Sequence, residues 1–305
     1  MIKKVKGLTL IELMLATGIA VVTLLGMVHY LNLWIRAQAQ QQQTSDLQLK
    51  ALKALSVLEY DLKRVGFFAR LTGRALHQAQ HFAPDNTLFH LNCSAFDQDA
   101  YLRWIYPLAK TGCALPDQGQ GFALTYLAQA DASMPYNRQV VCEKVNEHGQ
   151  FYFSSMACNK KEVRWYFRHV RYFIRQKDQP KLYVQWLSSR ADEGHTRSHL
   201  NTQVKAEGVE RLVILYGLGR KQDEHISIES YQTLDQSQPT LWSGRSEQHL
   251  IAIQIQVVVR SEHKAVQKIM RPQPIALIDG GVWAPQDDYL RLSMTRLIPL
   301  KHLLY

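Results

Sequence analysis

The sequence lacks the short motifs that mark the common catalytic sites. It contains no G-x-S-x-G, no glycine-rich phosphate loop, no H-E-x-x-H and no C-x-x-C. These absences remove the usual sequence evidence for a serine hydrolase, a nucleotide-binding enzyme, a zinc peptidase or a thiol oxidoreductase. We therefore expect a protein that is not an enzyme and that carries no cofactor.

Groups of metal ligands are also scarce. Two histidine pairs have the i,i+4 spacing of a helical metal site, namely His77 with His81 and His195 with His199, but neither has further ligands at a fixed spacing. Asp287 and Asp288 are adjacent carboxylates, and two are far fewer than the roughly six to eight oxygens that calcium takes. We therefore expect no metal site.

Lysine and arginine are absent from residues 8–35, which are almost wholly apolar. At about 1.5 Å per residue, a helix over this run spans roughly 40 Å, enough to cross a bilayer. Lys3, Lys4 and Lys6 precede the run, and this charge asymmetry predicts a cytoplasmic N-terminus and an exported remainder. No small-residue cleavage site of the secretory type follows the run. The two interpretations are a plain membrane anchor and an anchor with an assembly role.

Two residues favour the assembly role. Gly7 stands alone between the basic leader and the apolar run, and Glu12 places a carboxylate inside that run. An intramembrane charge calls for a partner, and cleavage after Gly7 would supply the ammonium group of Leu8 one helical turn away. The alternative is that Glu12 stays hydrated near the headgroups, favoured by the positive end of the helix dipole.

The heptapeptide G-L-T-L-I-E-L at residues 7–13 closely resembles the signature of type IV prepilins and pseudopilins. The resemblance implies that a prepilin peptidase cuts between Gly7 and Leu8, that the new amino group of Leu8 is methylated, and that Glu12 guides docking into a filament. Leu8 stands where the commonest form of the signature has Phe.

An apolar stripe predicts that the helix continues to about residue 65. The stripe recurs at steps of three and four residues: Leu47, Ala51, Leu55, Leu58, Leu62 and Val65. Glu59 and Lys63 form an i,i+4 pair, and Gly66 is expected as the C-cap. The predicted organisation is a leader at 1–7, a membrane or filament-core helix at 8–35, its amphipathic continuation at 36–66, and a globular β-rich domain at 67–305.

Cysteines are few, and all four lie in the part expected to face an oxidising compartment: Cys93, Cys113, Cys142 and Cys158. Three connectivities are open to two disulfides, of which sequential pairing is the simplest. The alternative is four buried thiols.

Strand signals dominate from residue 121 onward, with several short runs of alternating apolar and polar residues. Ten runs are expected as strands: 121–128, 139–142, 150–155, 162–170, 171–176, 181–187, 211–219, 225–232, 250–261 and 290–298. Their spacing favours an antiparallel sheet whose one face is covered by the long helix. We therefore predict an α+β, pilin-like fold.

Residues 208–219 (GVERLVILYGLG), Trp242 and residues 250–261 (LIAIQIQVVVRS) resemble the later half of PilW-type minor pilins. The helix end at 55–69 resembles the same family, with Lys63 and Phe67 at places where the family has Arg and Tyr. The resemblance implies a minor pilin that primes or caps a type IV pilus, with roles in twitching motility and, as candidates, DNA uptake or adhesion.

It also implies the partners: other minor pilins, the major pilin, a prepilin peptidase and the inner-membrane assembly platform. The expected location is the bacterial inner membrane, crossed once, with a periplasmic C-terminal domain, and then the pilus fibre. A related J-class pseudopilin of type II secretion is the alternative, and a DNA-binding or adhesive tip subunit is the alternative of another class.

Residues 163–175 combine basic and aromatic side chains. Arg164, Arg168 and Arg171 would contact DNA phosphates if they shared an exposed face, with aromatic rings available for stacking. We favour the plainer interpretation of amphipathic strands with aromatic residues in the core and arginines in water.

Overall fold

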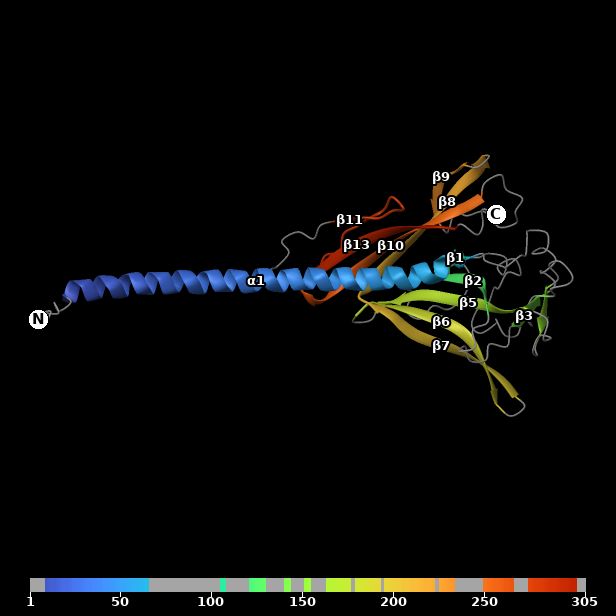
Figure 1. Cartoon of the computed structure of the whole chain (residues 1–305), viewed down its shortest axis with the longest axis horizontal. Coiled ribbons are helices and arrows are strands. Elements are labelled where there is room, and N and C mark those ends of the chain that lie inside the picture. The colour runs from blue at the N-terminus through green and yellow to red at the C-terminus, as the bar shows by residue number, and fades with distance from the viewer. Residues whose placement is uncertain are drawn as a thin grey trace, which may run out of the picture.

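One long helix followed by antiparallel sheets forms the whole described architecture, an α+β arrangement as predicted (Figure 1). The computed structural model describes residues 9–65, 105–107, 121–129, 140–143, 151–154, 163–176, 179–192, 195–222, 225–233, 249–265 and 274–300.

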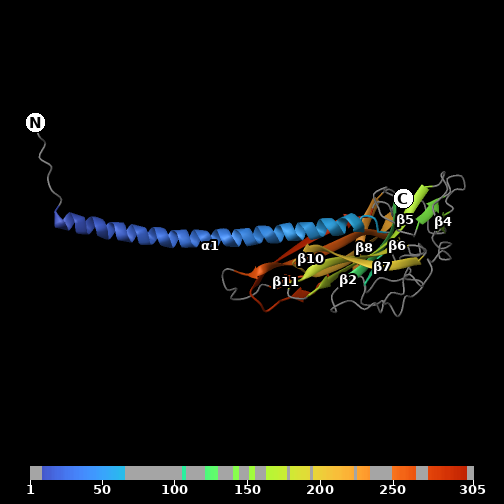
Figure 2. The same ribbon diagram turned by 90° about the horizontal axis from the view of Figure 1, so that it is seen from below.

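The helix α1 spans Leu10–Leu62 without interruption and therefore joins the predicted 8–35 and 36–66 segments. Its 53 residues extend about 80 Å, and Figure 2 shows its N-terminal part running far beyond the strands. The helix ends earlier than predicted, because Lys63 is the C-cap and keeps a right-handed conformation, with φ −61°. The expected C-cap, Gly66, lies outside the described residues.

The strands form two main sheets rather than the single sheet predicted. The first joins β1 (Ile105–Pro107), β2 (Gly121–Gln129), β3 (Val140–Glu143), β4 (Phe151–Ser154), β5 (Val163–Arg175), β6 (Lys181–Asp192) and β7 (His195–Glu207). The second has the order β13 (Tyr289–Pro299), β10 (His249–Lys264), β8 (Val209–Gln222) and β9 (His225–Thr233). A small hairpin joins β11 (Ile275–Ala276) to β12 (Val282–Trp283). All of these pairings are antiparallel.

Two strand predictions need correction. The runs 162–170 and 171–176 form the single strand β5, because no turn residue interrupts them. The strand β7 was missed because its sequence is polar. Among the described strands it pairs with β6 alone, and its residues 201–204 are exposed. An edge strand in water does not need the apolar alternation by which buried strands are found.

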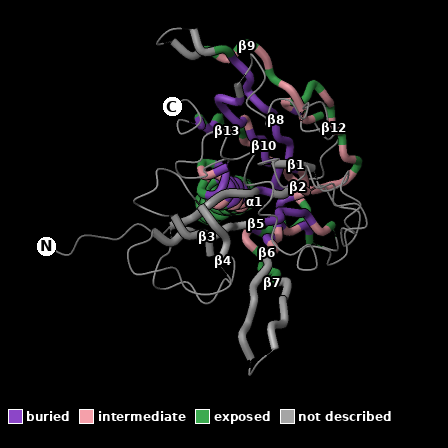
Figure 3. Tube along the Cα trace, turned by 90° about the vertical axis from the view of Figure 1, so that its right-hand side faces the viewer, coloured by how far each residue is buried: buried purple, intermediate pink, exposed green. Residues whose placement is uncertain are grey.

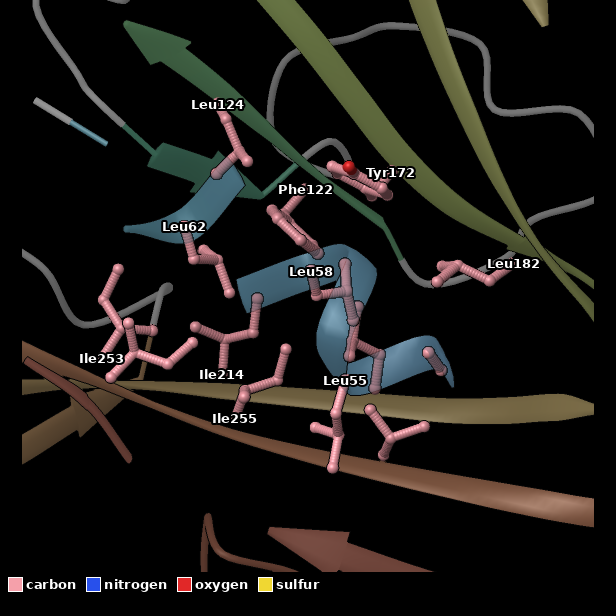
Figure 4. Packing of buried hydrophobic residues seen from close by; sticks show 14 of the residues in the cluster. Leu55, Leu58, Leu62, Phe122, Leu124, Tyr172, Leu182, Ile214, Ile253 and Ile255 are labelled. Atoms are coloured by element: carbon pink, nitrogen blue, oxygen red, sulfur yellow. The ribbon is translucent and has the colours of Figure 1, made fainter. Parts of the chain in front are cut away.

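The C-terminal end of α1 lies between the two sheets (Figure 3). All six residues of the predicted stripe are buried, at 0 to 3% exposure. Leu55, Leu58 and Leu62 point into a shared core with Phe122 of the first sheet and Ile255 of the second (Figure 4). Full burial of a leucine contributes about 1.5 to 3 kcal/mol, so this end of the helix is an integral part of the domain core.

Two polar contacts fix the rotation of α1 within that core. The hydroxyl of Tyr172 on β5 donates a hydrogen bond to the buried carboxylate of Asp61. On the other side, Arg296 of β13 forms an ion pair with Glu59, which also accepts the predicted i,i+4 contact from Lys63 at 2.6 Å. Each sheet therefore holds the helix by at least one specific polar contact as well as by packing.

Gly208 connects the two sheets. It has φ +76°, its N–H donates to the carbonyl of Pro180 at 2.7 Å, and its carbonyl accepts from the N–H of Arg260 at 2.7 Å. A Cβ at this position would lie 2.7 Å from the carbonyl oxygen of Arg260. Only glycine fits this passage from β7 to β8 without strain.

A buried charge cluster ties the second sheet together near its β10–β13 edge. The guanidinium of Arg291 is 5% exposed and donates to Glu210 of β8 and to Asp287, each at 2.7 Å. Arg260 lies 3.6 Å from the same Glu210. Burial alone would lower the pKa of Arg291, but hydrogen bonds to Asp287 and Glu210 outweigh burial and raise it, so the guanidinium stays charged.

Gln256 holds a short segment on the outer face of the second sheet. Its side-chain amide donates to the carbonyl of Ala276 at 2.9 Å and to Ser293 at 2.7 Å, and its oxygen accepts from the N–H of Ile278 at 2.9 Å. Leu277 packs there beside Val258. Because Gln256 is 3% exposed, these bonds satisfy a side chain that would be costly to bury alone.

Candidate assembly site

The N-terminal part of α1 exposes a continuous apolar surface. Residues 10–35 are all exposed, their large apolar side chains range from 44% for Leu31 to 79% for Leu10, and the first buried helix residue is Leu47. By length and composition, α1 is the one described helix suited to cross a membrane, and it fits a single-pass membrane anchor. An apolar surface of this extent marks a membrane or protein contact.

Two threonine hydroxyls within this surface bond to their own helix. Thr17 donates its hydroxyl to the carbonyl of Leu13 at 3.0 Å, and Thr23 donates to that of Ala20 at 2.8 Å. Hydroxyl groups satisfied in this way can enter an apolar environment at little cost.

Glu12 is the only charged side chain of residues 8–35, and it forms a capping box with Thr9. The Glu12 carboxylate accepts from the backbone N–H and from the hydroxyl of Thr9, both at 3.1 Å. The Thr9 hydroxyl accepts in return from the N–H of Glu12 at 3.4 Å. Glu12 thus begins the helix as well as carrying its charge, and the T-x-x-E spacing at 9–12 was a sequence signal for this role. Gly7 and Leu8 lie outside the described residues.

A second exposed apolar group lies on the part of α1 that packs on the domain. Leu49 is 64% exposed, Leu52 41% and Tyr60 59%, and the guanidinium of Arg64 lies 3.6 Å from the centre of the Tyr60 ring. These residues lie on the helix surface that neither sheet covers. Sequence analysis missed them because it sought the buried stripe alone.

The other predicted site residues are only partly placed. Cys142 lies in β3 between Tyr152 and Arg164, but its side chain and the other three cysteines are outside the described residues, so both disulfides stay predictions. Arg164 and Arg168 lie on β5 and are described by their backbone alone. Arg171 is 9% exposed, so its side chain belongs to the sheet rather than to an open surface.

The candidate metal ligands show ordinary roles where they are described. Asp287 pairs with Arg291, and Asp288 lies 3.8 Å from Lys264. Within the described ranges, no group of three potential ligands comes together. His195 and His199 lie on β7, not on a helix, while His77 and His81 are outside these ranges.

The comparison with known families matches residues 171–302 to the model for PilW, the type IV pilus-assembly protein W. Over this segment the chain is similar to PilW-type proteins of type IV pilus assembly. The PilW match runs from the middle of β5 through β13, and thus includes the whole second sheet on which α1 packs. No curated protein and no solved structure matches the chain.

The PilW segment and the N-terminal signature are separate parts of the sequence. The first lies within residues 171–302 and the second within residues 7–13. Two independent stretches therefore point to pilus assembly, one through the anchor and one through the sheet that holds it.

Proposed function

We propose that this protein is a minor pilin that joins other minor pilins to prime or cap a type IV pilus. The single observation that carries the proposal is the division of α1 into two halves. One half packs into the domain core, and the other exposes a largely apolar surface after a capped carboxylate. A helix divided in this way suits a subunit that is stored in a membrane and then transferred to a filament.

Glu12 is the residue on which the transfer depends in this proposal. On insertion scales a charge at the centre of a membrane helix costs about 2.5 to 3.5 kcal/mol. The capping box satisfies part of the hydrogen-bonding capacity of the carboxylate in the single subunit. After cleavage at Gly7, the ammonium group of Leu8 on a neighbouring subunit supplies the countercharge. The remaining apolar side chains of α1 then pack against other helices in place of lipid.

The exposed residues Leu49, Leu52 and Tyr60 extend the same contact toward the domain. They form a second exposed apolar group on the same helix, separated from the membrane segment by the polar residues 36–46. We assign them to the contact with the next subunit, so that recognition between minor pilins involves both the membrane segment and the domain end of α1.

The decisive experiment compares Glu12→Gln with Thr9→Val in cells that lack the native protein. Both substitutions disturb the capping box, but only the first removes the charge. Glu12→Gln should reduce surface pili strongly while leaving leader removal intact, as mass spectrometry of the mature N-terminus at Leu8 would show. Thr9→Val should reduce them much less. Normal piliation in the Glu12→Gln cells would refute the docking role.

The pseudopilin alternative makes a different prediction. A type II secretion subunit leaves pili intact when deleted and abolishes secretion of exoproteins. The PilW match supports the pilus role, and deletion with counts of both surface pili and secreted protein separates the two.

A further inference from the structure

The strand β13 forms one border of the second sheet. Among the described strands it pairs with β10 alone. The pairing of residues 291–299 with residues 252–260 is unbroken, and the register shift between the two strands lies beyond Arg260. β13 therefore presents a long, regularly bonded strand along this border.

Alternate residues of β13 turn their backbone groups away from β10. The N–H of Leu300 donates to the carbonyl of Ile251 at 2.9 Å, so the even-numbered residues of this stretch bond to β10. In an antiparallel ladder the intervening residues direct their N–H and C=O groups to the other side. No described strand lies on the side to which four residues direct these groups: Arg291, Ser293, Thr295 and Leu297. Such a row is a template for one more strand.

The charged side chains of β13 do not block this edge. Free edges of native sheets are commonly protected by charges, bulges or proline. β13 has two charged residues, and both are engaged within the domain: Arg291 is 5% exposed in the charge cluster described above, and Arg296 is paired with Glu59. Its proline is the last residue, Pro299. The opposite edge strand, β9, has a register shift within its pairing to β8. The β13 edge is therefore the less protected border of this sheet.

β13 runs beside α1 and in the same direction (Figure 1). Near the start of the strand, the carbonyl of Lys264, opposite Tyr289, accepts a hydrogen bond from Gln43 at 3.4 Å. Near its end, Arg296 is paired with Glu59. The helix rises about 24 Å between its two contacts and the strand about 23 Å, so the two elements stay level along this length.

The border between α1 and β13 carries partly exposed apolar side chains. Leu52 precedes Glu59 by seven residues, which places both on the side of the helix that faces β13, and Leu52 is 41% exposed. Leu292 and Met294 lie on the face of β13 toward α1 and are only partly buried. The free edge of β13 is therefore continuous with the exposed apolar group of α1 that we assign to the next subunit.

We propose that an extended segment of a neighbouring minor pilin joins the second sheet as a strand beside β13. This inference rests on the proposed function, because it specifies how the next subunit contacts this one. The added strand pairs with the outward backbone groups of β13, and its alternate side chains cover Leu52, Leu292 and Met294. Main-chain hydrogen bonds supply the affinity of such an addition and alternate side chains its specificity. The partner segment is therefore expected to alternate apolar and polar residues.

A second copy of this chain, joined at the same edge, does not fit. Two identical edge strands that pair antiparallel are related by a two-fold axis. Because β13 runs in the same direction as α1, this axis would point the two helices in opposite directions. The two membrane segments could not then cross one bilayer with the same orientation. We therefore assign the occupant to another minor pilin.

The test compares Thr295→Pro with Thr295→Ala in the full chain, in cells that lack the native protein. Thr295 is exposed, and its N–H faces the free edge. Proline removes this N–H and leaves the bonds to β10 intact, whereas alanine removes the side chain and keeps the N–H. Each variant carries an affinity tag, and the other minor pilins that co-purify with it in detergent are quantified by mass spectrometry. Thermal unfolding verifies that the domain core is intact.

Thr295→Pro should reduce the co-purified minor pilins at least fivefold, and Thr295→Ala should reduce them less than twofold. A second measurement uses the native chain, alone and in the co-purified complex, so that the proposal stays testable if proline disturbs the fold. Amide hydrogen exchange at Ser293, Thr295 and Leu297 should slow at least tenfold in the complex. Exchange at Met294 and Arg296, which bond to β10, should change less than twofold.

Three results would overturn the proposal. Equal losses in the two variants would assign the contact to the side chain of Thr295. Slow exchange at Ser293, Thr295 and Leu297 in the chain alone would mean that the chain itself already covers the edge. Co-purification of two differently tagged copies of this chain, lost in Thr295→Pro, would identify a second copy as the occupant.

The comparison with Glu12→Gln separates this proposal from the proposed function. Normal co-purification with Thr295→Pro, together with a loss of surface pili in Glu12→Gln, would refute strand addition and leave the assembly role standing. Reduced co-purification with Thr295→Pro, together with normal piliation in Glu12→Gln, would support strand addition and refute the docking role of Glu12.

Discussion

Tyr172 on β5 donates a hydrogen bond to Asp61 on α1, and both side chains are buried at the centre of the domain. The two residues are 111 positions apart in the sequence. Asp61 interrupts the apolar turn between Leu58 and Leu62, and the hydroxyl from the first sheet satisfies its buried carboxylate. The bond therefore adds a directional contact to the packing of Leu55, Leu58 and Leu62.

Substitution of Tyr172 by Phe should lower the free energy of unfolding by about 1 to 3 kcal/mol, because a buried carboxylate loses a hydrogen bond while the ring still fills its space. Denaturant unfolding of Tyr172→Phe, Asp61→Asn and the double variant measures the coupling between the two residues. Strictly additive losses would show that the bond contributes nothing of its own.

Substitution of two leucines of α1 distinguishes a loss of stability from a loss of assembly. Leu55 is 1% exposed and Leu49 is 64% exposed. Leu55→Ala should cost about 2 to 5 kcal/mol of stability through lost burial and a cavity, whereas Leu49→Ala should change stability by less than about 0.5 kcal/mol. Leu49→Ala should nevertheless reduce association with other minor pilins, measured by co-purification from membranes. Unchanged association would remove Leu49 from the proposed contact surface.

Gly208 and Gly280 form a matched pair for backbone strain. Both have positive φ, at +76° and +86°, but a Cβ at Gly208 meets the Arg260 carbonyl oxygen, while one at Gly280 meets nothing within 4 Å. Gly280→Ala should cost about 1 kcal/mol for its conformation alone. Gly208→Ala should cost at least about 1 kcal/mol more, as thermal unfolding would show. Equal losses of stability in the two variants would mean that the backbone at Gly208 shifts to accommodate the added Cβ at no further cost.

Low pH should reduce the stability of the folded domain, because two carboxylates lose their charge. The hydrogen bond from Arg291 lowers the pKa of Asp287, and hydrogen bonds from Lys63 and Arg296 lower that of Glu59. A carboxyl group whose pKa is lower in the folded state stabilises above its unfolded pKa, about 4, and this contribution is lost as pH falls through the folded pKa. Stability should therefore drop below about pH 4.

Arg291→Met tests the part due to Asp287. The variant should be less stable at pH 7 by about 3 to 5 kcal/mol, because Glu210 and Asp287 lose a buried partner. Its denaturation midpoint should also depend less on pH between 5 and 2 than that of the native chain. An unchanged pH profile would assign the acid sensitivity to other groups.

Gln256→Leu should release the segment that covers the outer face of the second sheet. The substitution removes the bonds to Ala276, Ile278 and Ser293 while keeping an apolar side chain of similar size. Amide hydrogen exchange should rise at residues 275–283 and stay unchanged in the core of β10. Protection of 275–283 equal to that of the native chain would show that Leu277 and its apolar neighbours suffice.

The sequence was most informative where one physical effect dominates. The stripe from Leu47 to Val65 is fully buried because a helix on a core needs one apolar face, and the 3.6-residue period reveals that face. The helix, its extent over both predicted segments and the run of antiparallel strands followed from the same kind of pattern.

Features that depend on residues far apart in the chain could not be predicted from the sequence. Nothing local to β8 or β10 indicates that they form a second sheet, because the division depends on the turn at Gly208 and on burial of α1 from two sides. The hydrogen bond between Asp61 and Tyr172 and the cluster around Arg291 join residues far apart in the chain. The capping box of Thr9 and Glu12 is local, and its T-x-x-E spacing could have predicted it, although the sequence analysis considered Glu12 only as a membrane-embedded charge.

The placement of α1 between two sheets also has a mechanical consequence. The helix runs alongside the long strands β10 and β13 (Figure 1), so tension applied at its exposed N-terminal end acts parallel to the interface. Contacts from Leu47 to Val65 then resist sliding together instead of separating one after another. A subunit built in this way transmits a pull on the filament into the centre of its domain, and its resistance to extraction scales with the length of helix held between the sheets.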